Sequence, residues 1–259
     1  MNFPLQLIEA LGALVINGIG LLGRFVLFLA AALRYIVTPP FKPRLLIRQI
    51  RTIGADSMFV ILLIGTFTGM VLGLQGADTL RRFGAEGALG TLVALTLVRE
   101  LGPVLGALVI AARAGSAMAA ELGSMQVTEQ VDALTVMAIN PVQYLVSPRL
   151  LAGMISFPLL TAVFNVVGVF GGFAVGVGLM GAPAGSYFNG IARYLSLHDI
   201  RTGVYKALLF GLVVTWVCCY KGYYAARMAT GVSRATTEAV VLSSVLILVW
   251  DYFLGSVLL

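Results

Sequence analysis

The chain has 259 residues, of which 59% are hydrophobic and only 11% are charged. Soluble domains are about 45–50% apolar and about 25% charged, so this composition excludes an ordinary water-soluble domain and makes lipid the solvent for most of the chain. The net charge of +6 does not indicate nucleic-acid binding, because the basic residues are scattered between apolar runs. We therefore expect an integral membrane protein with no nucleic-acid partner.

The N-terminal region predicts one long helix over about residues 5–37. Pro4 suits the first turn of such a helix, and Gln6, Glu9 and Arg24 recur at helical spacing beside a wide apolar face. This pattern favours a helix lying in the membrane interface, with a full span as the alternative. The prolines and basic residues of 38–51 indicate a helix break and a basic linker. We take 1–51 as an N-terminal interfacial and cytoplasmic region.

Five further apolar runs are each about 20 residues long, as a bilayer requires. We expect spans at about 53–77, 88–112, 150–179, 203–224 and 237–257, which together form one domain over 52–259. Outside these spans, ten Lys and Arg residues fall on the N-terminal side of the membrane and four on the other. The positive-inside rule then places the N-terminus in the cytoplasm and the C-terminus outside.

Two spans carry glycines at four-residue spacing. The first span has Gly65, Gly69 and Gly73, and the third has a matching ladder over residues 168–176. Small residues stacked on one helix face let two helix backbones approach closely, which is a main source of helix association in lipid. The ladders predict tight helix packing and say nothing about substrate.

The segment between the second and third spans predicts a short amphipathic helix over about 127–138. Gly123 and Ser124 are expected to interrupt the preceding helix, and Thr128 to cap the new one. Its apolar positions include Val131 and Leu134, and its polar positions include Glu129 and Asp132. Helices that lie on a membrane surface are usually basic on the polar face. Because this one is acidic, we favour docking to a protein partner over a membrane-surface role.

Ionisable residues inside the spans are the second candidate for function. Arg99 and Glu100 lie about 11 residues into the second span, near the predicted middle of the bilayer. Neighbouring residues on a helix point about 100° apart, so each is expected to find a partner on another helix or subunit. Lys206 and Asp251 lie at similar depth in the last two spans and predict an ion pair. These charged residues could form ion pairs that fix the order of the helices, or they could line a cavity, and the sequence leaves both roles open.

The motifs of several enzyme classes are absent from the sequence. No G-x-x-x-x-G-K-[ST] loop occurs, so we expect no ATP hydrolysis by this chain. Cys218 and Cys219 match no metal-ligand spacing, and His198, the only histidine, has no G-x-S-x-G serine to serve. The sequence predicts a transport subunit with no metal and no cofactor of its own.

Four stretches carry a family resemblance: GMVLGLQG from residue 69, LVRELGPVLGALVIAARAGSAMAAELGSMQVTEQVDAL from residue 97, INPVQYLVSPRLLAG from residue 139 and GVSRATTEAVV from residue 231. On these the chain resembles the MlaE (YrbE-type) permeases of bacterial ABC transporters that move phospholipid for outer-membrane lipid asymmetry. The resemblance runs from about residue 45 to the end.

The resemblance implies an all-α fold, with an N-terminal interfacial helix, five spans and a cytoplasmic coupling helix, in the bacterial inner membrane. It also implies a homodimer, two ABC ATPase subunits that bind ATP and magnesium, a hexameric periplasmic MCE-domain protein, and a STAS-domain protein on the ATPase. The ATPase would grip Glu129, Val131, Asp132 and Leu134. Phospholipid would occupy a cavity between the two permeases, lined by Leu72, Leu80, Phe83, Arg99, Glu100 and Lys206.

A rival interpretation is an ion-coupled secondary transporter or channel that uses Glu100. The acidic cytoplasmic helix argues against it, since a secondary carrier needs no docking surface for a motor. A structural scaffold would leave Arg99 and Glu100 without a purpose. The direction of lipid movement and the head-group preference do not follow from the sequence.

Overall fold

The protein is an all-α membrane protein, as the long apolar runs and the family resemblance predicted. The computed structural model describes residues 3–38 and 43–258, which contain helices and no strand. Six of the described helical stretches are long and apolar enough to cross a membrane: Ile16–Ile36, Pro43–Arg82, Glu86–Val127, Val142–Gly176, Leu197–Tyr223 and Ala229–Val257. The last five correspond to the five predicted spans, each with longer or shifted bounds.

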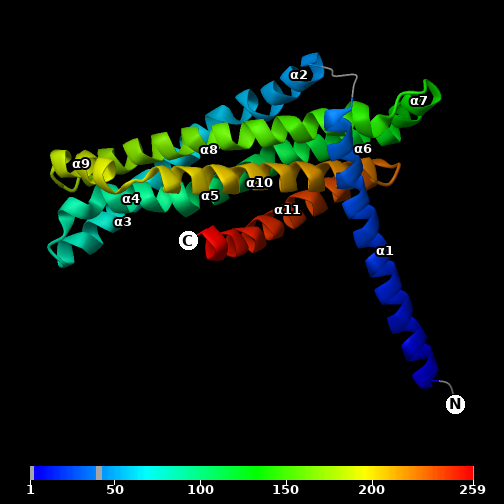
Figure 1. The fold of residues 1–259 in the computed structure, drawn as a ribbon, viewed down its shortest axis with the longest axis horizontal. Coiled ribbons are helices and arrows are strands. Elements are labelled where there is room, and N and C mark those ends of the chain that lie inside the picture. The colour runs from blue at the N-terminus through cyan, green and yellow to red at the C-terminus, as the bar shows by residue number, and fades with distance from the viewer. Residues whose placement is uncertain (1–2, 39–42, 259) are drawn as a thin grey trace.

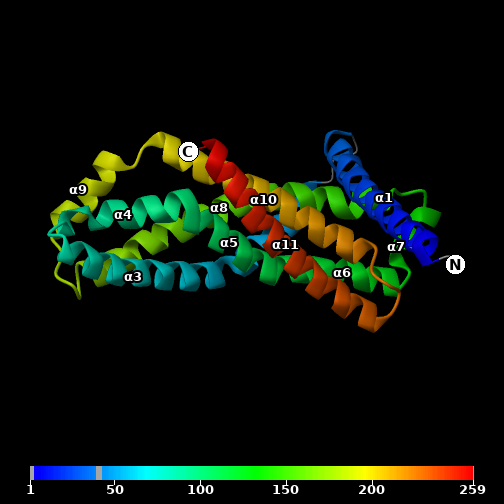
Figure 2. The same cartoon turned by 90° about the horizontal axis from the view of Figure 1, so that it is seen from below.

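Most of the long helices run side by side along one axis, with small helices at the two ends (Figure 1). The first small helix, α7, lies at one end, and the second, α9, lies at the other (Figures 1 and 2). The helices are α1 Phe3–Val37, α2 Pro43–Ile53, α3 Met58–Arg82, α4 Leu89–Thr96, α5 Gly102–Ile110, α6 Ser116–Val127, α7 Gln130–Val136, α8 Ser147–Gly176, α9 Ala184–Tyr194, α10 Leu197–Tyr223 and α11 Ala229–Leu258. We call the α7 end the coupling end and the α9 end the outer end.

The predicted glycine ladders pack against each other and join α3 to α8. A Cβ atom added to Gly69 would lie 1.8 Å from the carbonyl oxygen of Gly168, and one on Gly73 would lie 2.6 Å from that of Gly172. No side chain fits at such distances, so the two backbones touch directly. The predicted tight packing is confirmed.

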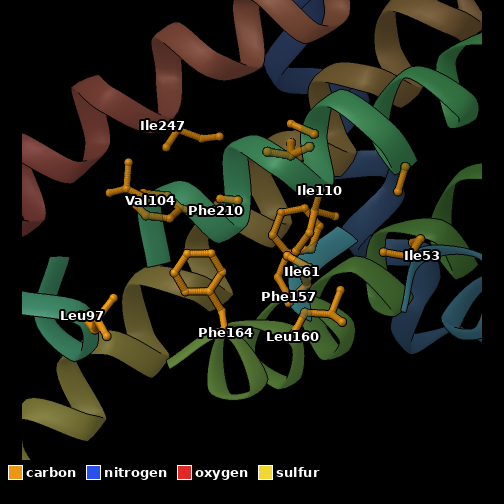
Figure 3. Close-up of a cluster of buried hydrophobic side chains, with 14 of the residues drawn as sticks. Ile53, Ile61, Leu97, Val104, Ile110, Phe157, Leu160, Phe164, Phe210 and Ile247 are labelled. Atoms are coloured by element: carbon orange, nitrogen blue, oxygen red, sulfur yellow. The ribbon is translucent and has the colours of Figure 1, made fainter. Parts of the chain in front are cut away.

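Large apolar side chains from several spans fill the interior between the helices. Figure 3 shows Phe157, Phe164 and Phe210 meeting Ile61 and Ile110 in this core. Other large apolar residues face outward, among them Phe67 and Leu159, which are 60% and 61% exposed. A surface this apolar fits a lipid surrounding and no aqueous one.

α1 runs across the bundle axis at a steep angle in Figure 1. Its C-terminal half is held by aromatic side chains: Phe25 stacks on Trp216 with ring centroids 3.9 Å apart, and the indole N–H of Trp216 donates to the carbonyl of Phe25 at 3.1 Å. This direction fits a helix lying along the interface, although residues 16–36 are also long enough to span. The interfacial placement stays a prediction.

The basic linker predicted before the first span is wrong, because Pro43–Ile53 is the helix α2. Leu46, Gln49, Ile50 and Ile53 recur at helical spacing and bury one side of α2, while its arginines stay exposed. The apolar face decides the conformation. The helix break predicted at Pro39 and Pro40 lies outside the described residues.

The predicted start of the cytoplasmic helix is also wrong. α6 continues through Gly123 to Val127, where Gly123 allows close packing: a Cβ there would lie 3.2 Å from Val232. The Thr128 hydroxyl donates back to the carbonyl of Ser124 at 2.9 Å and does not cap α7. Glu129 precedes α7 with φ +57°, in the left-handed region. The helix observed is Gln130–Val136, which is shorter than the predicted 127–138.

At the outer end, α9 folds back onto the bundle through Tyr187. This residue is 1% exposed, and its hydroxyl donates to the carbonyl of Val169 at 2.9 Å. Burial raises the pKa of Tyr187 to about 12, so the phenol stays protonated as a donor. The helix α9 therefore covers the outer end of the bundle.

Candidate functional site: a charge cluster inside the bundle

Five ionisable residues from three spans form two adjoining groups of ion pairs in the outer half of the bundle, and we call them the charge cluster: Arg99, Glu100, Asp199, Lys206 and Asp251. Arg99 and Glu100 lie in a π-helical turn, Leu97–Leu101, which interrupts the second span between α4 and α5. Such a turn widens the helix locally and is frequent at functional sites. Pro103 follows directly after this turn, in the first turn of α5.

Arg99 reaches the first turn of α10. Its guanidinium nitrogens Nε and Nη2 lie 2.8 and 2.7 Å from Asp199 Oδ1. The other oxygen of Asp199 accepts from the backbone N–H and the hydroxyl of Ser196, both at 2.9 Å, in a capping box that starts α10. Asp199 thus fixes the helix start and the arginine together.

Glu100 points to a different partner, as the predicted divergence of the two side chains required. Lys206 Nζ lies 2.5 Å from Glu100 Oε2 and 2.9 Å from Asp251 Oδ1. The predicted pair of Lys206 and Asp251 is confirmed, and Glu100 completes a three-residue bridge across α10, α11 and the π-helical turn. Lys206 itself is fully buried.

The charge cluster combines buried anchors with accessible members. Lys206 and Asp199 have 0% and 3% of their side chains exposed, whereas Arg99 and Glu100 have 38% and 37% exposed. Three acidic and two basic side chains make up the cluster. Removing such charges from water is costly unless they are paired, and here each has a partner. Arg99 and Glu100 remain available to a polar ligand.

Leu72 lines an apolar groove of about 380 Å³ beside the charge cluster. The groove lies along α3, and Leu101 from the π-helical turn closes one side of it. Leu80 is half-buried against the core, and Phe83 is 79% exposed just beyond the end of α3. Of the six residues predicted to line a cavity, the groove takes in Leu72, the charge cluster takes in Arg99, Glu100 and Lys206, and the other two lie nearer the outer end.

The predicted coupling residues divide between the protein interior and the surface. Val131 is 4% exposed and Leu134 is half-buried, both packed against a cluster that includes Phe28 and Leu122. Glu129 is exposed, whereas Asp132 forms an ion pair with Arg227 at 2.8 Å. The apolar face of α7 therefore holds the helix to its own chain.

The tip of α7 offers apolar surface that the sequence analysis did not single out. Val136 is 88% exposed and Met137 is 60% exposed, at the far coupling end of the molecule (Figure 1). Val136 is the last residue of α7 and Met137 is its C-cap, so their exposure depends on the true helix bounds, which were predicted too long. Exposed apolar side chains beside acidic ones suit a protein partner.

Asp199 was missed as a member of the charge cluster, although the sequence held a signal for it. Ser196 and Asp199 have the spacing of a capping box directly before an apolar run. That motif would have placed a carboxylate at the outer end of the fourth span. The choice of Arg99 as its partner depends on the helix arrangement, which the sequence does not contain.

The fold and the charge cluster define a multi-pass membrane protein of the transport type: a helix bundle with paired charges inside and a short helix projecting at one end. Comparison with known proteins identifies one family. The chain belongs to the MlaE permease family, whose model, described as "Permease MlaE", matches residues 46–257. It is therefore a membrane permease subunit.

Curated relatives extend the similarity over nearly the whole chain. The "Intermembrane phospholipid transport system permease protein MlaE" of Haemophilus influenzae is 43% identical over 97% of each chain. The "Probable ABC transporter permease protein RT0041" of Rickettsia typhi is 43% identical over 91% of each. A chloroplast protein of Arabidopsis thaliana, "Protein TRIGALACTOSYLDIACYLGLYCEROL 1", is 36% identical over 81% of this chain and 60% of its own.

Proposed function

We propose that this chain is the permease subunit of an ABC transporter that moves phospholipid between the bacterial inner membrane and a periplasmic MCE-domain carrier, and so maintains outer-membrane lipid asymmetry. The family and the Haemophilus relative, named for intermembrane phospholipid transport, support the substrate class. The relative from Rickettsia, named as an ABC transporter permease, supports the energy source.

The observation that supports the proposal most is that one π-helical turn, Leu97–Leu101, presents both an apolar side chain and charged side chains. Leu101 closes the apolar groove that includes Leu72, while Arg99 and Glu100 of the same turn present partly exposed charges. Acyl chains gain about 0.8 kcal/mol per buried CH₂ and need no directional partner, whereas a phosphate head group needs charged or hydrogen-bonding partners. A phospholipid has both parts, and they match the two surfaces.

The assembly belongs to the same proposal. A second copy of the chain would face the α3 groove and the exposed apolar side of α11, and two ABC ATPase subunits, holding ATP and magnesium, would dock at α7 through Glu129, Val136 and Met137. A hexameric MCE-domain protein would sit on the outer end, and a STAS-domain protein would bind the ATPase. In this arrangement the N-terminus is cytoplasmic and the C-terminus periplasmic.

An ion-coupled carrier built on Glu100 has less support. Lys206 holds that carboxylate at 2.5 Å, and Asp251 balances the lysine from the other side. A carboxylate that binds and releases a transported ion would have to exchange this partner in each cycle. The structure offers Glu100 a fixed cation within its own chain.

Site-specific photo-crosslinking in cells tests the proposed function. A photoreactive residue at Leu72 or Arg99 should capture phospholipid, and a matched probe at Leu159, which is 61% exposed on α8, should capture much less. In the same strains, affinity purification should recover the ATPase and MCE-domain subunits. Equal lipid capture at all three positions would mean ordinary bilayer contact, and a chain that purifies without an ATPase would contradict the assembly.

A further inference from the structure

A second hollow lies on the other side of the same π-helical turn. It has a volume of about 330 Å³ and lies between α8, α9, α10 and the turn, with Val98, Val166, Ile191 and Ile200 among its walls. Val98 of the turn lines this hollow and Leu101 of the same turn lines the α3 groove, so the turn lies between the two. We call it the lateral hollow.

The lateral hollow is apolar and opens sideways. Its walls include two polar side chains, Thr161 and Asn165, and their unpaired oxygens face the glycines Gly106 and Gly102 of α5. On α8 its rim is formed by Ala162, Val166 and Phe170, all exposed to the surroundings of the bundle. A hydrocarbon chain entering from the bilayer fits such walls, whereas water finds too few hydrogen-bonding partners there.

One cationic side chain, Arg201, lies beside the lateral hollow at the outer end. Arg201 follows the wall residue Ile200 and lies about 60° around α10 from Val204, another wall residue. It is exposed, and within residues 3–38 and 43–258 it has no acidic partner. Arg193, on α9, lies about 200° around its helix from the wall residue Ile191, and its guanidinium lies 5.7 Å from the centroid of the Tyr194 ring. An arginine without an acidic partner beside an apolar hollow suits a lipid phosphate.

We propose that the lateral hollow binds one anionic phospholipid of the outer leaflet as a resident lipid, with one acyl chain in the hollow and its phosphate at Arg201. The proposal uses the predicted orientation of the bundle but not the transport function. The bound chain would lie against the contact between the turn and α10, where a Cβ on Gly203 would be 2.4 Å from the carbonyl oxygen of Val98. The resident lipid would thus brace the junction that positions Arg99 and Asp199.

A local binding measurement on the purified full chain tests this inference. A photoreactive residue replaces Val204 inside the hollow, and delipidated protein is titrated with phosphatidylglycerol, then with diacylglycerol, which lacks the phosphate. Ala162→Trp should fill the hollow from its open side and weaken capture roughly tenfold, or about 1.4 kcal/mol. Leu159→Trp, on the same helix but outside the hollow, should leave capture unchanged.

Two further variants keep the test decisive. Val166→Trp fills the same space from another position if Ala162→Trp does not fold. Arg201→Gln should reduce capture of phosphatidylglycerol to that of diacylglycerol, whereas Arg193→Gln, on the face of α9 opposite to Ile191, should not.

Equal capture by the Ala162→Trp and Leu159→Trp proteins would overturn the site and leave ordinary annular lipid. If the protein with its native arginines captured phosphatidylglycerol and diacylglycerol equally, the proposed role of the phosphate would be overturned. Lipid capture at Leu72, measured in the same preparations, reports separately on the proposed transport cavity.

Discussion

The two ends of the bundle use ion pairs in different ways. In the outer half, Lys206 is fully buried between two carboxylates contributed by two other spans. At the coupling end, Asp132 and Arg227 are about half exposed, and Lys221 and Arg234 share Glu238 near the surface. Exposed pairs typically contribute about 0.2–1 kcal/mol, whereas breaking a buried pair costs about 3–5 kcal/mol. The buried pairs of the outer half hold one arrangement, and the exposed pairs of the coupling end can change at little cost.

The largest expected effect comes from removing the buried lysine. Lys206→Met leaves Glu100 and Asp251 facing each other without their cation, and we expect a loss of about 3–5 kcal/mol in the free energy of unfolding. The matched control is Lys221→Met on the same helix, where the lysine is 29% exposed and the loss should stay below about 1 kcal/mol. Thermal unfolding in detergent measures both. Similar losses in the two variants would remove the proposed contrast.

A second variant asks whether burial or location decides the cost. Arg149 is 2% exposed near the coupling end and pairs with Glu121 at 2.8 Å. Because Glu121 is 40% exposed and can regain water, Arg149→Met should fall toward the lower end of the range of about 3–5 kcal/mol. Arg227→Gln, exposed at the same end, is the control. A loss for Arg149→Met no larger than for this control would make location, and not burial, the deciding factor.

A third variant tests the rigidity that the backbone gives to the outer half. Gly69→Ala places a methyl group 1.8 Å from the carbonyl oxygen of Gly168, so α3 and α8 must separate. Overpacking of this kind typically costs about 1–3 kcal/mol. Gly185→Ala, where nothing lies within 4 Å of the added carbon, should be close to neutral. The same thermal assay separates the two, and a tolerant Gly69→Ala would show that the helices are not held backbone to backbone.

The sequence predicted the bundle well because its strongest signals are local. Long apolar runs predicted the spans, four-residue glycine spacing predicted tight helix packing but not that α3 would contact α8, and equal depth predicted the pair of Lys206 with Asp251. Helix bounds near Gly123 and Thr128 were wrong because packing against Val232 lets a glycine continue a helix. The pairs of Glu100 with Lys206 and Arg99 with Asp199 depend on helix rotation, which no single helix encodes.

The smallest effect on stability, and the most informative one on coupling, is expected at α7. Glu129→Lys with Asp132→Lys should leave the permease folded but weaken ATPase binding several-fold, because both acids lie at the exposed end of the molecule. Asp132 faces Arg227 at 2.8 Å, so its change has two possible consequences: loss of a contact with the ATPase, or loss of the ion pair that joins α7 to the segment between α10 and α11.

The charge swap Asp132→Arg with Arg227→Asp separates these two consequences. The swap restores the internal pair, and ATPase binding should recover if Asp132 acts through that pair. If binding stays low, Asp132 contacts the motor directly. A pull-down in which the double lysine variant retains full ATPase binding would remove both acids from the coupling surface and leave Val136 and Met137 to carry it.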